Sequence, residues 1–131
     1  MTVTYSSYLH LDELLAAQQP LSQGPEHDEM LFIVIHQVYE LWFKQLLHEA
    51  AHLGAALEQD DLPRVYATLK RFLTILKVQV AQIDILETMS PVSFLSFRAR
   101  LDTASGFQSP QFRELEFVLG GRNARMIDHK A

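Results

Sequence analysis

The stretch HDEMLFIVIHQVYELWFKQLLHEAAHLGAALEQ, residues 27–59, decides the fold that this sequence predicts. Its apolar residues cover nearly the whole circumference of a helical wheel, which is typical of a buried, central helix. Asp28 and Glu29 stand where the positive end of a helix favours acidic side chains. We therefore predict a long helix from about Asp28 to about Gln59, which would reach roughly 45 Å at 1.5 Å per residue.

A second long helix is predicted after the turn EQDDLP, with Pro63 in its first turn. Apolar residues there recur at alternating steps of three and four, which is typical of the seam of a helical bundle. The series consists of Leu62, Val65, Leu69, Phe72, Leu76, Ile83 and Leu86. Gln79 alone interrupts it. The two long helices are expected to form an antiparallel hairpin.

Shorter helices are expected on both sides of this hairpin. Residues 8–19, YLHLDELLAAQQ, predict one helix that Pro20 ends. Ser90-Pro91 and Ser109-Pro110 are typical starts for helices in VSFLSFRARL and QFRELEFVL, with the loop DTASGFQS between them. The fold class is therefore all-α, a helical bundle built on a long antiparallel hairpin with short flanking helices.

Composition narrows the class of protein. A chain of 131 residues, of which 48% are hydrophobic, suits a single helical domain over residues 1–131. The net charge of -5, without a basic stripe, argues against a nucleic-acid partner. The longest apolar run, LFIVI, is too short to span a bilayer, and no signal peptide is evident. With no cysteine, the chain fits the reducing cytosol, so we expect a cytoplasmic protein without a membrane partner.

His36 is the first candidate for a functional residue. On a helical wheel its neighbours include Phe32, Tyr39, Glu40 and Phe43. A neutral imidazole in such aromatic surroundings could form one hydrogen bond with a ligand, or act as a base near neutral pH. The same pattern fits an ordinary core histidine whose hydrogen-bond partner is Glu40, four residues later.

Other polar residues offer weaker signals. His48 and His52 have a spacing that could share a metal ion, but the Glu of the HExxH motif and a third ligand are lacking, which favours a solvated face. Arg98 follows apolar residues and could bind a carboxylate through two hydrogen bonds, or pair with Glu87 or Glu116.

The loop ASGFQS could present backbone N–H groups and the Ser105 hydroxyl to a ligand, or could simply connect two helices.

Several stretches together resemble a known family. They are YSSYLHLDELLAAQQPLS, HDEMLFIVIHQVYELWFKQLLHE, and the pair SFLSFRARL with SGFQSPQFRELEFVLG. In this order and spacing they are similar to the N-terminal part of tryptophan 2,3-dioxygenase, a haem enzyme, and they correspond to roughly its first half. The resemblance implies an oxidoreductase of tryptophan catabolism. With haem and O2, it would open the indole 2,3-bond of tryptophan or a related indole to give N-formylkynurenine.

The resemblance also implies roles for individual residues. His36 would lie on the distal side of the haem and bind the indole N–H, as the catalytic residue, with Phe32 lining the same pocket. Arg98 would bind the substrate carboxylate. The family usually has a tyrosine four residues before this arginine, whereas this chain has Phe94, which lacks the hydroxyl.

Further matched positions border the expected site. Ser105 and Gly106 would lie beside the haem and the substrate. Tyr5, Tyr8 and Leu9 match positions that reach into the pocket of a neighbouring subunit. The resemblance therefore implies a homo-oligomer, typically a tetramer.

The chain departs from the family in one respect. The family's haem iron is held by a proximal histidine in the second half of the protein, and His129 does not occupy that motif. Haem iron needs an axial ligand for controlled O2 chemistry, and none is identified here. A fragment, a degenerate paralogue, a partner-completed enzyme and a short protein with a changed ligand all fit this pattern. The alternatives to catalysis are a silent haem- or indole-binding paralogue and a structural oligomerisation module with His36 in its core.

Overall fold

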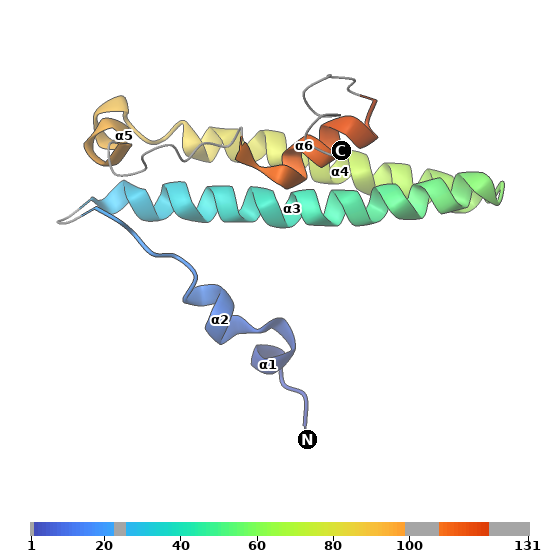
Figure 1. Ribbon diagram of the computed structural model, residues 1–131, viewed down its shortest axis with the longest axis horizontal. Coiled ribbons are helices and arrows are strands. Elements are labelled where there is room, and N and C mark those ends of the chain that lie inside the picture. The colour runs from blue at the N-terminus through green and yellow to red at the C-terminus, as the bar shows by residue number, and fades with distance from the viewer. Residues whose placement is uncertain (1, 23–25, 99–107, 121–131) are drawn as a thin grey trace.

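The computed structural model describes residues 2–22, 26–98 and 108–120, with the backbone alone for 96–98, and its regular structure in these ranges is entirely helical. The helices are α1 (Tyr5–Leu9), α2 (Leu11–Leu15), α3 (His27–Glu58), α4 (Leu62–Leu86), α5 (Pro91–Arg98) and α6 (Pro110–Val118) (Figure 1). The predicted all-α fold is confirmed. Within the described ranges, no helix has both the length and the apolar character needed to cross a membrane.

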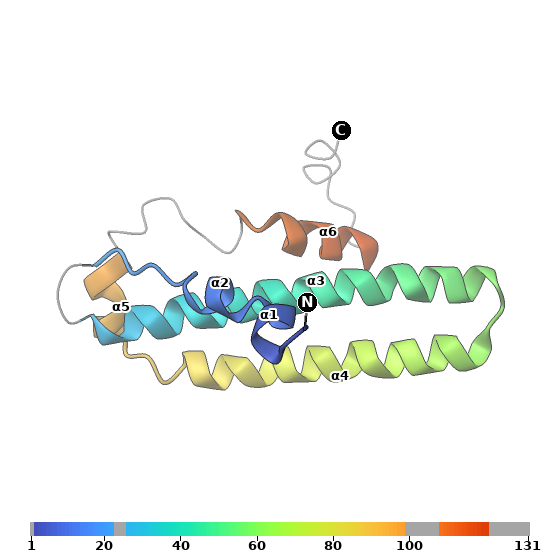
Figure 2. The same ribbon diagram turned by 90° about the horizontal axis from the view of Figure 1, so that it is seen from below.

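The long hairpin is the frame of the molecule. Helices α3 and α4 run antiparallel and side by side, while α6 lies over the middle of α3 and α5 lies beside its first turns (Figure 2). The core forms where three helices meet, with Leu46 of α3 packed among Phe72 and Ile75 of α4 and Leu115 of α6. Helix α3 is therefore the central helix, and its predicted bounds are confirmed to within one residue.

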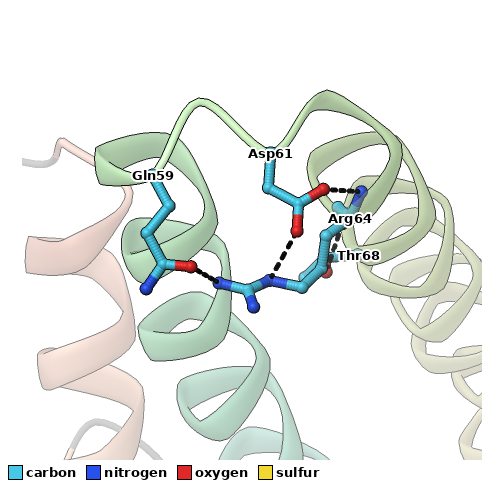
Figure 3. Close-up of polar contacts among 4 residues, drawn as sticks. All are labelled: Gln59, Asp61, Arg64 and Thr68. Carbon is cyan, nitrogen blue, oxygen red and sulfur yellow. Dashed lines mark hydrogen bonds and ion pairs between the residues drawn. The ribbon is translucent and has the colours of Figure 1, made fainter.

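Side chains fix the turn between the two long helices (Figure 3). The carboxylate of Asp61 caps α4 by accepting a hydrogen bond from the backbone N–H of Arg64 at 3.3 Å, and its other oxygen lies 3.9 Å from Arg64 Nε. Arg64 Nη2 in turn donates to Gln59 Oε1 at 3.2 Å. Asp60 takes up the left-handed backbone conformation, with φ 53°, that reverses the chain. The turn expected from EQDDLP is confirmed.

The face of α4 that packs on α3 is rotated from the predicted seam. Its buried residues are Val65, Thr68, Phe72, Ile75 and Gln79. Leu69 and Ile83, which were expected in the seam, are 40% and 43% exposed. A second apolar series runs along the outer side of α4 and consists of Leu62, Tyr66, Leu69, Leu73, Val80 and Ile83. Because the predicted seam takes residues from both the buried face and this outer series, heptad spacing alone cannot determine which of the two faces α3.

The predicted single helix over residues 8–19 is wrong. Helix α1 begins earlier, because Thr4 and Ser7 form a reciprocal pair of side-chain caps. It ends at His10, whose left-handed conformation (φ 54°) separates α1 from α2. Helix α2 already ends at Leu15. Both short helices project away from the hairpin (Figure 1).

The predicted starts of the last two helices are confirmed. Ser90 Oγ accepts a hydrogen bond from the backbone N–H of Ser93, and Ser109 Oγ accepts one from the backbone N–H of Phe112, each at 3.1 Å. Helix α5 is described as far as Arg98. The expected continuation of that helix and residues 102–107 of the expected loop lie outside the described residues.

Candidate functional site

His36 is half-buried on α3. Its Nδ1 lies 2.8 Å from the backbone carbonyl oxygen of Phe32, one turn earlier in the helix. Because a carbonyl oxygen can only accept a hydrogen bond, Nδ1 must carry the proton in this contact. In the neutral ring, Nε2 then keeps its lone pair and can accept a hydrogen bond from another molecule. The backbone of α3 thereby selects the tautomer that a ligand with an N–H group would need.

Aromatic rings flank His36 in both directions along α3. The ring centroid of Phe32 lies 4.3 Å from that of His36 and 5.7 Å from that of Phe94 in α5. On the other side of His36 along the helix, Phe43 lies 5.7 Å from Phe112 of α6. Phe43 also packs against the core around Leu46, so the rings of Phe32 and Phe94 are the ones that give His36 an apolar side. The structure thus brings together three of the predicted site residues, which are Phe32, His36 and Phe94.

Tyr39 belongs to the same aromatic series, but its hydroxyl forms a hydrogen bond between the two long helices. Its ring stacks on Phe43 at 6.2 Å, and its hydroxyl donates to the backbone carbonyl of Gln79 in α4 at 2.9 Å. Burial raises the pKa of the Tyr39 hydroxyl above its ordinary value, so the group stays protonated and able to donate. This hydrogen bond also connects the two long helices next to His36.

Glu40 does not act as the partner of His36. Glu40 Oε1 accepts hydrogen bonds from Ser109 Oγ at 3.0 Å and from Gln111 Nε2 at 3.1 Å, and Gln111 Nε2 lies 2.9 Å from the Glu40 carbonyl oxygen. The prediction that Glu40 is the hydrogen-bond partner of His36 is therefore wrong. Instead, Glu40 fastens the start of α6 to α3, one turn after His36. This contact could not be predicted from the sequence, because Ser109 and Gln111 lie about 70 residues after Glu40.

Three of the predicted site residues lie wholly or partly outside the described structure. Arg98 is the last residue of α5, one helical turn after Phe94, and its side chain lies outside the described part of the structure. Ser105 and Gly106 also lie outside it. Their predicted contacts with a ligand stay predictions.

Tyr5, Tyr8 and Leu9 lie on α1 and not beside His36. They are exposed, Tyr5 by 76% and Tyr8 by 69%. Large apolar side chains exposed together mark surfaces that bind another molecule. Their expected role at the pocket of a neighbouring subunit stays a prediction.

Two other features lie apart from this site. His48 and His52 are exposed on α3, as a solvated face requires, and the described ranges contain no group of three or more metal-binding side chains. An open apolar groove of about 670 Å³ lies on α4. Its lining residues are Lys70, Leu73, Thr74, Leu76, Lys77 and Val80, none of which belongs to the predicted site.

Comparison with known proteins identifies similar sequences. The tryptophan 2,3-dioxygenase family model matches residues 1–131. A tryptophan 2,3-dioxygenase of Herpetosiphon aurantiacus is 58% identical over 129 residues, covering 98% of this chain and 50% of the relative. Those of Anaeromyxobacter sp. strain K and Bordetella pertussis are 60% and 49% identical, covering 95% and 98% of this chain but 46% and 45% of the relatives. The chain thus spans about half the length of these curated relatives.

Proposed function

This chain belongs to the tryptophan 2,3-dioxygenase family, and we propose that it takes part in the haem-dependent opening of the indole 2,3-bond of L-tryptophan or a related indole. The product would be N-formylkynurenine, which retains both atoms of O2. The observation that carries the proposal is the state of His36, whose Nδ1 is bound to the Phe32 carbonyl and whose Nε2 is left as an acceptor beside aromatic rings.

The described residues suit the indole half of such a substrate. Indole is flat and apolar, and the rings of Phe32 and Phe94 provide an apolar wall for it. Indole also has one polar N–H, and Nε2 of His36 provides one acceptor. Phe94 can offer only apolar contact, because it has no hydroxyl.

The amino-acid half of the substrate would be bound by Arg98. A guanidinium can donate two parallel hydrogen bonds to one carboxylate, which fixes both position and orientation. Arg98 follows Phe94 by one turn of α5, and Phe94 is in contact with Phe32. Ser105 and Gly106 would complete the border of the pocket. These three assignments are supported by the family resemblance.

The residues described here fit one side of a haem. His36, Phe32 and Phe94 suit its distal side, where the substrate would lie. The other histidines in the described ranges are His10, His27, His48 and His52, and all of them are exposed. The family resemblance implies that the iron would be held by a histidine that is not among them. A bound haem would supply the activation of O2, while His36 and Arg98 would bind and orient the amino acid.

A homo-oligomer, with the tetramer typical of the family, forms part of this proposal. The exposed Tyr5, Tyr8 and Leu9 of α1 support it, because a neighbouring copy would cover them. In such an assembly α1 of one copy would border the site of the next. We place the protein in the cytosol, which agrees with its lack of cysteine.

Hemin and tryptophan test the proposed function directly. Purified protein mixed with hemin should develop a sharp Soret band, and the loaded protein given tryptophan and ascorbate in air should form N-formylkynurenine. Haem uptake without product would favour a catalytically silent binder. If the protein neither took up haem nor gained thermal stability from tryptophan, the proposed binding would be contradicted. A structural oligomerisation module would then remain.

A further inference from the structure

Glu29, in the first turn of α3, is buried to an unusual degree for an acid, with 1% of its surface exposed. Its carboxylate accepts hydrogen bonds from the backbone N–H groups of Leu21 at 2.9 Å and Ser22 at 3.0 Å, and also from the Ser22 hydroxyl. A buried carboxylate is stable only when such donors replace its water. Both of these residues belong to the segment that precedes α3.

Gln37, about two turns later on α3, forms a second attachment to the same segment. Its Oε1 accepts a hydrogen bond from Gln18 Nε2 at 2.8 Å, and its Nε2 donates to the carbonyl of Ala17 at 3.0 Å. The two attachments are eight residues apart, or about 12 Å along the helix. Two fixed points at this separation determine the direction of residues 17–22 as well as their position.

This anchored segment carries α1 and α2. Neither of these helices contains a buried residue, and both project away from the hairpin (Figure 1). Their own packing therefore does not set the angle at which they leave it. The hydrogen bonds of Glu29 and Gln37 connect the segment that carries them to α3.

We propose that Glu29 is a positioning residue that, together with Gln37, aims the N-terminal arm, residues 2–16, away from the hairpin. The arm then holds Tyr5, Tyr8 and Leu9 where a second copy of the chain can meet them. The anchoring rests on the contacts above, whereas its use at a neighbouring site rests on the proposed function. The sequence indicated only that an acid suits the start of α3, and the donors in residues 21 and 22 were not foreseen.

The lack of cysteine allows the direction of the arm to be measured. Ser6→Cys in α1 and Lys44→Cys in α3, both at exposed positions, would carry a pair of spin labels. Labelled chain diluted in unlabelled chain should give a narrow distance distribution by double electron–electron resonance. Glu29→Gln keeps the shape of the side chain but removes its charge, so it should broaden this distribution. It should also speed hydrogen exchange of the Leu21 and Ser22 amides by about tenfold or more.

The matched control is Glu58→Gln, which removes an exposed charge at the far end of α3 and should change neither readout. A distribution that stays narrow in folded Glu29→Gln would overturn the proposal. If that variant does not fold, Gln37→Ala removes both hydrogen bonds of the second attachment, and a distribution that stays narrow there would overturn the proposal equally. Neither readout requires haem or tryptophan, so a failure of the proposed function would be seen separately.

Discussion

Leu46→Ala is expected to lower the free energy of unfolding by about 2–5 kcal/mol. Leu46 is fully buried where α3, α4 and α6 meet, in contact with Phe72, Ile75 and Leu115. Removing most of its side chain leaves a cavity that two long, stiff helices cannot easily close. Urea denaturation followed by circular dichroism would measure the loss.

Leu41→Ala is the matched control for this prediction. Leu41 lies on the same helix but is 52% exposed. Its truncation should change the free energy of unfolding by no more than about 0.5 kcal/mol. Equal losses at the two positions would show that α3 is not packed as described.

Arg98→Ala should weaken tryptophan binding by about 2 kcal/mol or more, which corresponds to about thirtyfold in the dissociation constant. The proposed contact is a charge-assisted pair between the guanidinium and the substrate carboxylate. Tryptamine, which has no carboxylate, should bind the parent and the variant equally. Calorimetric titration of hemin-loaded protein with both ligands would separate a lost carboxylate contact from a general defect.

Arg113→Ala provides a control for the loss of a positive charge near the same helices. The guanidinium of Arg113 lies 3.6 Å from the carboxylate of Glu116 in its own helix, α6. This variant should keep the parent affinity for tryptophan. An Arg98→Ala variant that binds tryptophan as tightly as the parent would remove Arg98 from the site.

Much of the fold follows from local sequence. Helix α3 was predicted to within one residue because its apolar run is long, and the starts of α5 and α6 were predicted because Ser-Pro combines a cap with a fixed backbone angle. The break at His10 was missed, since no glycine or proline marks it. The rotation of α4 was missed because two apolar series share its surface.

The candidate site, too, could be predicted from the sequence only in part. Spacing along α3 was enough to place Phe32 and Phe43 on the side of His36, because residues three, four and seven apart share one face of a helix. The tautomer of His36 could not be read from the sequence, since it depends on the distance between a ring nitrogen and a carbonyl. The hydrogen-bond partners of Glu29 and Glu40 could not be predicted from the sequence either, because loops and tertiary packing bring them together.

The central claim is that Nε2 of His36 accepts the indole N–H of a guest held beside Phe32. Its most direct test compares the affinities of L-tryptophan and of the analogue with sulfur in place of the indole nitrogen, which removes the donor and adds little bulk. The parent protein should prefer tryptophan by about threefold to tenfold, the worth of one neutral hydrogen bond, and His36→Phe should show no preference. The same preference in both proteins would contradict the account.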